Sequence, residues 1–227
     1  MTTDLVSTIK ANLAEIDSNI RKMAMHTGTN HPAPKLIAVS KVQPDDRVEA
    51  ALNAGHRVYG ENRVQEAESR WKERRKAYPD LELHLIGGLQ TNKAAEAVAL
   101  FDYIHSVDRP KLVKALATEM KKQEKFLPVY IQVNTGREDQ KSGCLQEDVA
   151  SLLGLCTENG LTVLGLMCIP PVDDDPSLHF ALLRKLALKH GLKHLSMGMS
   201  GDYALAASMG ATDIRVGTAV FGERDYG

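Results

Sequence analysis

The sequence predicts an α/β fold, a (β/α)8 TIM barrel preceded by an extra N-terminal helix. Eight short apolar runs alternate with amphipathic stretches, which is the pattern of parallel strands joined by helical crossovers. The 227 residues are slightly fewer than a barrel of this kind usually has. No linker or low-complexity segment marks a second domain. We therefore expect residues 1–227 to form one domain.

Residues 4–26 are expected to form the extra helix. Their apolar side chains recur at helical spacing, at Leu5, Ile9, Leu13, Ile16 and Ile20. Residues 28–34 contain Gly28, Pro32 and Pro34, which end a helix. Residues 1–34 are thus expected to supply a helix and a loop ahead of the first strand.

The rest of the chain supplies the alternating units. Strands are expected near 36–41, 56–60, 82–86, 102–105, 128–133, 161–167, 193–196 and 213–216. Helices are expected near 45–54, 63–77, 91–99, 109–122, 146–158, 177–190 and 202–209. Capping residues, prolines and glycines mark several helix ends. The expected starts are Pro44, Asp108–Pro110, Asp175–Pro176 and Ser200, and the expected stops are Gly55, Gly191 and Gly210.

Composition excludes several classes of protein. A net charge of −1 argues against a dedicated nucleic-acid binder. Cys144, Cys156 and Cys168 are too few and too evenly spread for a disulfide framework, so we expect buried thiols. There is no leader-like start and no apolar run of membrane-spanning length. A cytoplasmic protein without a membrane partner is expected.

Two clusters have alternative interpretations. The basic run 70–76 is expected to be a solvated helix face with Trp71 packed inward; alternatively, Trp71 stacks on a nucleic-acid base. His84 and His105 lie on different strands without a neighbouring pair of carboxylates. We expect buried or hydrogen-bonded histidines and no metal site.

Function in such a barrel is found at the carboxyl ends of the strands. Lys41 closes the first apolar run and shares a strand face with Ile37 and Val39, which suggests that it points into the barrel. A lysine there can form a Schiff base. The alternative is a side chain that extends from the strand end into solvent.

The last two strands are followed by loops rich in glycine and hydroxyl groups. Ser200 and Gly217–Thr218 are suited to holding a phosphate, or else they are an ordinary helix cap and an ordinary turn. Arg215 either forms an ion pair with Glu61 or Asp213 or touches the ring of a bound cofactor. Barrel closure brings the first and last strands together. A lysine beside a phosphate cup is the arrangement that pyridoxal phosphate (PLP) needs.

Motifs along the chain resemble the pyridoxal phosphate homeostasis protein family, a single-barrel relative of the N-terminal domain of alanine racemase. The resemblance runs from about residue 35 to the C-terminus. The matching segments are 38–41 (AVSK), 60–66 (GENRVQE), 84–93 (HLIGGLQTNK), 132–136 (QVNTG), 141–143 (KSG), 165–167 (GLM), 195–202 (LSMGMSGD) and 215–222 (RVGTAVFG).

The resemblance implies a role for each site residue. Lys41 would carry the cofactor as a Schiff base, and Arg215 would lie at the pyridine nitrogen. Asn62 and either Met197 or Met199 would lie near the ring. The phosphate would be held by Ser200, Gly217 and Thr218.

The family also implies a function: storing PLP, sequestering it, or delivering it to PLP-dependent apo-enzymes, without a catalytic activity of its own. We expect a monomer. An arginine at the pyridine nitrogen and the lack of a second domain to supply an opposing base both favour weak catalysis. The alternatives are a PLP-dependent amino-acid racemase or lyase, and an aldolase that uses Lys41 on a phosphosugar without PLP.

Overall fold

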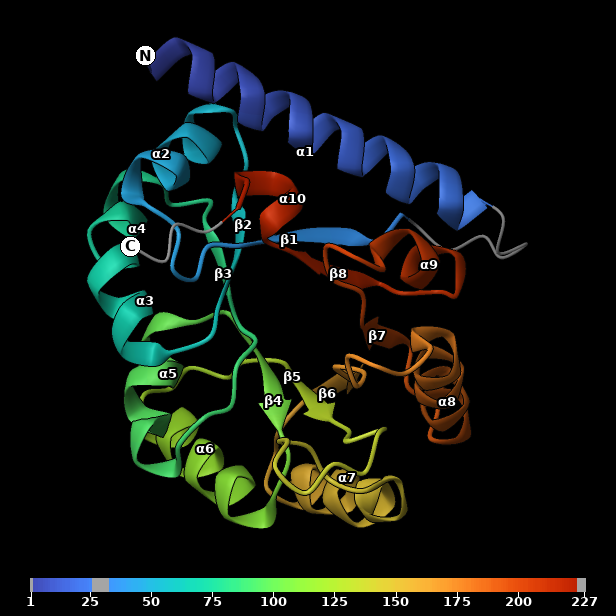
Figure 1. Cartoon of the computed structure of the whole chain (residues 1–227). Coiled ribbons are helices and arrows are strands. Elements are labelled where there is room, and N and C mark those ends of the chain that lie inside the picture. Colours follow the sequence, from blue (N-terminus) through green and yellow to red (C-terminus); the bar gives the residue numbers. More distant parts are fainter. Residues whose placement is uncertain (1, 26–32, 224–227) are drawn as a thin grey trace.

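Eight parallel strands form a closed barrel with helices around its outside (Figure 1). The computed structural model describes residues 2–25 and 33–223. Neighbouring strands pair in chain order, and the pairing of Ile37 with Arg215 and Ala38 with Val216 joins β1 to β8. This closure places the first strand beside the last. The predicted (β/α)8 barrel is confirmed.

The strands lie where the apolar runs predicted them, with every boundary within two residues of the expected one. They are β1 (Lys35–Val39), β2 (Val58–Glu61), β3 (Glu82–Leu85), β4 (Tyr103–Val107), β5 (Val129–Gln132), β6 (Val163–Met167), β7 (His194–Ser196) and β8 (Asp213–Val216).

The predicted helices are also present, and the segment 63–77 is divided into two helices directly after the buried Trp71. The helices are α1 (Thr2–Ala24), α2 (Asp45–Asn53), α3 (Val64–Trp71), α4 (Arg74–Ala77), α5 (Ala94–Leu100), α6 (Pro110–Lys122), α7 (Val149–Glu158), α8 (Pro176–Lys189), α9 (Tyr203–Ser208) and α10 (Thr218–Phe221). Two 3-10 turns, η2 (Thr91–Lys93) and η3 (Gln146–Asp148), precede α5 and α7.

Helix α1 is the extra helix, and it packs across α2, α9 and α10 over the region where the barrel closes (Figure 1). Its own side chains Ile9, Ile16 and Ile20 are buried on the face that packs against the barrel, as their spacing predicted. Residues 26–32, which hold most of the predicted loop, lie outside the described residues.

Local signals at the helix ends gave mixed results. Asp175 caps α8 by accepting from Ser177 N at 2.9 Å, and the predicted stop glycines have positive φ. The Asp108 cap is wrong, because its Oδ1 instead accepts from the Arg109 guanidinium at 2.5 Å. The Ser200 cap is also wrong, because α9 begins only at Tyr203 and the Ser200 hydroxyl faces another loop.

Side chains on the strands divide into two layers. Leu83, Ile104, Leu166 and Ile214 face the helices and join one apolar core that also holds the three cysteines. The three thiols are free and buried, as predicted, and burial raises the pKa of Cys168 to about 12. The alternate positions face the barrel interior, where many residues are polar. No described helix is both long enough and apolar enough to cross a membrane.

Candidate functional site

A cavity of about 280 Å³ opens among the carboxyl ends of the strands. It is bounded by residues at the ends of β1, β2, β3, β6, β7 and β8 or directly after them. The lining residues are Val39, Lys41, Asn62, Ile86, Ile169, Met199, Ser200, Gly201, Arg215, Gly217 and Thr218. This is the end of the barrel at which function was expected.

Every predicted site residue except Met197 lines this cavity. Met197 is fully buried in the helix-side core, whereas Met199 is 37% exposed and borders the cavity. The two methionines were alternatives in the sequence. The structure brings only Met199 to the site.

Lys41 lies in the turn that follows β1, and its strand neighbour Val39 lines the same cavity. Asn62 follows β2 and is held close to the end of β3. A side chain at Gly87 would bring its Cβ to 2.3 Å from Asn62 O. Glycine is therefore required at position 87 for these two segments to meet.

The two predicted phosphate loops meet at Ser200. Its Oγ accepts from Gly217 N at 3.3 Å and from Ala219 N at 3.5 Å. Two backbone N–H groups at the start of α10 thus converge on one oxygen atom. A helix start with converging N–H groups favours an anionic oxygen.

Arg215 forms the floor of the cavity. Its Nη1 donates to Ser196 Oγ at 2.6 Å, and its Nη2 donates to Cys168 O at 2.9 Å. The alternative ion pair with Glu61 or Asp213 is not found among the described residues. Glu61 bonds to Trp71 of α3, and Asp213 accepts from Tyr130 OH at 2.7 Å. Burial lowers the pKa of the Arg215 guanidinium from its ordinary value.

A buried polar chain continues below Arg215 through the barrel. Ser196 Oγ lies 2.8 Å from His105 Nδ1, His105 Nε2 lies 2.8 Å from His84 Nδ1, and His84 Nε2 lies 2.7 Å from Glu82 Oε1. Tyr130 stacks on His105 at 4.1 Å between ring centroids. His84 and His105 are hydrogen-bonded core residues, as predicted.

One order of donors satisfies this chain of hydrogen bonds. Although burial opposes it, hydrogen bonds from His84 and Lys35 lower the pKa of Glu82 to about 2, so its carboxylate only accepts. His84 then donates to Glu82 and accepts from His105. Burial lowers the pKa of His105 well below its ordinary value, so its Nδ1 accepts from Ser196. Ser196 in turn accepts from Arg215.

The basic run 70–76 differs from its prediction. Trp71 is fully buried, which confirms inward packing and leaves no face for a nucleic-acid base. The side chains of Arg70 and Arg74 are each only 17% exposed. Only Lys72, Glu73 and Lys76 form the solvated face that was expected for the whole run. In the described part of the chain, no group of three metal-binding side chains is present.

Comparisons with known proteins agree with this geometry. Residues 11–225 match the family model of the alanine racemase N-terminal domain. A pyridoxal phosphate homeostasis protein of Pseudomonas aeruginosa is 41% identical, and the match covers 98% of both chains. One of Vibrio alginolyticus is 39% identical, over 97% of this chain and all of that protein. The chain belongs to this family.

A solved structure has the same barrel. PipY of Synechococcus elongatus, determined without PLP, superimposes with a TM-score of 0.85 at 36% identity. The match covers 94% of this chain and all of PipY. PipY has also been determined with PLP bound, and that structure superimposes with a TM-score of 0.80.

Four residues that line the cavity were not predicted from the sequence to belong to the site. They are Val39, Ile86, Ile169 and Gly201. Strand alternation offered a signal for two of them, since Val39 shares a face with Lys41 and Ile86 shares one with His84. Gly201 is the direct neighbour of Ser200. Ile169 lies in the loop after β6, and no local pattern marks it as part of the site.

Proposed function

We propose that this chain binds PLP through a Schiff base to Lys41 and serves to store, sequester or deliver the cofactor. The observation that carries the proposal is the meeting of Lys41, Arg215 and the Ser200–Thr218 loops at one cavity. The residues come from the two ends of the chain, and barrel closure joins them. Membership of the homeostasis family supports the same function.

The residues present fit this cofactor. The cavity volume lies near the lower end of the range for small-molecule sites, roughly 300–1,000 Å³. Among the residues that line it within the described ranges, there is an amine, a guanidinium and hydroxyl groups, but no carboxylate. Such a lining suits a small anion. The backbone N–H groups that meet at Ser200 suit the phosphate of PLP.

Bound PLP supplies an aldehyde that a primary amine can attack and a ring that withdraws electrons. Lys41 would hold the cofactor through its amine, the group that condenses with such an aldehyde. Ser200, Gly217 and Thr218 would hold the phosphate, while Asn62 and Met199 would flank the ring. Arg215 would lie at the ring nitrogen.

The same residues favour binding over catalysis. Ser196 and Cys168 hold the Arg215 guanidinium where it lines the cavity, and a donor at the ring nitrogen would keep that nitrogen unprotonated. The ring is then a weaker electron sink. In the described ranges, no tyrosine or histidine lines the cavity to serve as an opposing base. We therefore propose no turnover of amino acids at an enzyme-like rate.

Delivery of PLP to apo-enzymes, a monomeric state and a cytoplasmic location complete the proposal. An open site without a second base suits exchange of the cofactor with other proteins.

Borohydride reduction followed by peptide mapping tests the site. Cofactor fixed to Lys41 is expected, and fixation to Lys93 or Lys141 instead would contradict the assignment. The colour of the purified protein is a second test. A PLP Schiff base is yellow, whereas the lysine of an aldolase is colourless.

Proton exchange tests the absence of catalysis. Holoprotein incubated with L- and D-amino acids in heavy water should exchange the α-proton no faster than free PLP does, as measured by NMR. Exchange near the median enzyme rate of roughly 10 per second would instead support the racemase alternative.

A further inference from the structure

The turn that carries Lys41 has a strained backbone. After β1 ends, Val42 has a φ of +59°, a conformation that β-branched residues rarely adopt. The turn is closed by Gln43 N, which donates to Ser40 O at 3.1 Å. Strained backbone persists only where its surroundings fix it. The contacts that fix this turn therefore bear on where Lys41 points.

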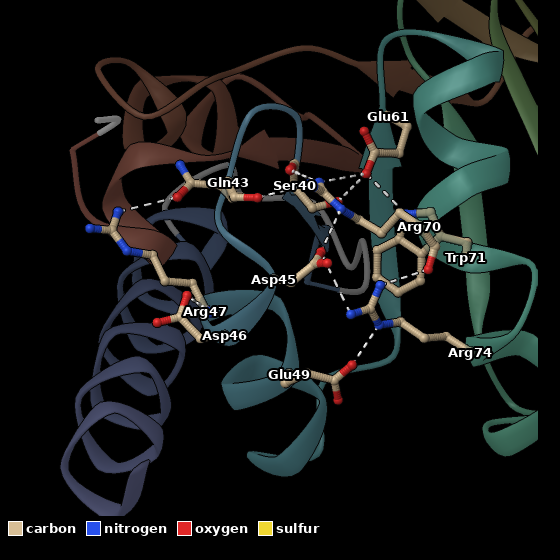
Figure 2. A network of polar contacts seen from close by, with 10 residues as sticks. All are labelled: Ser40, Gln43, Asp45, Asp46, Arg47, Glu49, Glu61, Arg70, Trp71 and Arg74. Carbon is tan, nitrogen blue, oxygen red and sulfur yellow. Dashed lines mark hydrogen bonds and ion pairs between the residues drawn. The ribbon is translucent and has the colours of Figure 1, made fainter. Parts of the chain in front are cut away.

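Arg70 of α3 supplies those contacts from the helix side of the barrel (Figure 2). Its Nη1 donates to Ser40 O, and its Nη2 donates to Gln43 O at 2.7 Å. One planar guanidinium thus bridges the first and last residues of the turn. A lysine, with a single ammonium group, lacks this fork of donors.

Glu61 holds Arg70 in place. Its buried Oε1 accepts from Ser40 Oγ at 2.6 Å and from Trp71 Nε1 at 2.9 Å, and it lies 3.3 Å from Arg70 Nη1 (Figure 2). A buried carboxylate with three partners fixes the orientation of each of them.

Direct chain neighbours link this network to the cavity. Ser40 and Glu61 bond to Arg70 and Trp71 of α3, and the residues that follow them, Lys41 and Asn62, line the cavity. Fixing the first pair on the outside of the barrel therefore fixes the second pair on its inside.

We propose that Arg70, held by Glu61, is a positioning residue for Lys41. The proposal deepens the proposed function and rests on it. Arg70 orders the turn before the cofactor arrives, so the amine is already placed for bond formation. Without Arg70, the turn samples other conformations, and it must be ordered again when PLP bonds to Lys41. The entropy lost in ordering about one residue should lower the affinity for PLP about tenfold.

Two ligands separate this role from a general structural one. PLP can bond to Lys41, whereas pyridoxine 5′-phosphate has the same ring and phosphate with an alcohol in place of the aldehyde. In Arg70→Met, PLP affinity should fall about tenfold, and affinity for pyridoxine 5′-phosphate should stay within twofold of that of the unmodified protein.

Arg74→Met is the matched control. Arg74 belongs to the same network and bonds Glu49 Oε1 at 2.6 Å and Arg70 O at 2.7 Å, but it makes no hydrogen bond to residues 40–43 (Figure 2). Neither affinity should change in this variant. Amide hydrogen exchange at Gln43, measured without ligand, should become faster in Arg70→Met and remain unchanged in Arg74→Met.

The outcomes are distinct. Equal loss of both affinities in Arg70→Met, or an unchanged PLP affinity, overturns the positioning role. If Arg70→Met does not fold, Arg70→Lys replaces it; a smaller fall confined to PLP is expected, and an unchanged ratio of the two affinities overturns the role. Unmodified protein that does not prefer PLP to pyridoxine 5′-phosphate contradicts the proposed function itself.

Discussion

The two halves of the barrel interior are built differently. At the amino end, Glu82, His84, His105 and Ser196 satisfy one another's hydrogen bonds and fill the space. At the carboxyl end, the interior opens into the cavity that Lys41 lines. Arg215 belongs to both halves, since it donates to Ser196 below and lines the cavity above.

The filled half should contribute mainly to stability, and the open half mainly to ligand binding. Buried polar groups are tolerated in the filled half because each has a partner, and removing one partner leaves another unsatisfied. In the open half, Lys41, Arg215 and the phosphate loops border a cavity. Substitutions in the filled half should therefore lower the free energy of unfolding first, and substitutions in the open half should change ligand binding first.

The largest expected effect is in the open half. Lys41→Ala should abolish covalent attachment, so that borohydride fixes no PLP and the visible absorbance band is absent. Binding through the phosphate loops should remain, as measured with pyridoxine 5′-phosphate. Continued fixation of PLP in this variant would show that another lysine is the attachment point.

The next effect is in the filled half. His105→Phe should leave His84 Nδ1 and the hydroxyl hydrogen of Ser196 each without their partner, which costs about 3 kcal/mol of the free energy of unfolding. Urea titration of the ligand-free protein measures this cost. His105→Gln retains an amide donor and acceptor and should lose less. A loss below about 0.5 kcal/mol in the Phe variant would break the comparison between the halves.

Glu82 should contribute to the pH dependence of stability. Its folded pKa of about 2 lies below the ordinary 4.5, so its contribution is present above about pH 4.5 and is lost as pH falls towards 2. Allowing for its partial exposure, the contribution is about 2 kcal/mol. Urea titrations across this range should show the difference between unmodified protein and Glu82→Gln shrinking as pH falls. A constant difference would contradict the prediction.

The smallest effect concerns the phosphate loops. Ser200→Ala should weaken PLP binding by about 1–2 kcal/mol, the contribution of one hydrogen bond to a charged group. Pyridoxal, which lacks the phosphate, should bind much more weakly than PLP and lose little in the variant. Isothermal titration with both ligands makes this comparison. Equal affinity for pyridoxal and PLP would show that the loops are ordinary turns.

Much of the fold could be predicted because its signals are local. The eight apolar runs located every strand to within two residues, and Asp175–Pro176 marked the start of α8. These signals depend on neighbours within about one helical turn, which the sequence contains directly. The proximity of Lys41 and Arg215 also followed, because closure of a predicted barrel makes the first and last strands neighbours.

Other features required the register of the whole barrel. Ser200 looked like the cap of the next helix, but it bonds to Gly217, and Arg70 looked solvated, but it reaches the turn after β1. His105 meets Ser196, 91 residues along the chain. Such contacts depend on how strands align and how helices pack, which no local pattern encodes.

The sequence by itself thus determined the barrel, its strand ends and most of the residues that surround the cavity. The tertiary structure decided which polar groups partner one another, which methionine faces the site and what holds the Lys41 turn. The physical reason is that strand periodicity fixes the direction of each side chain, whereas its partner is fixed only when distant segments pack together.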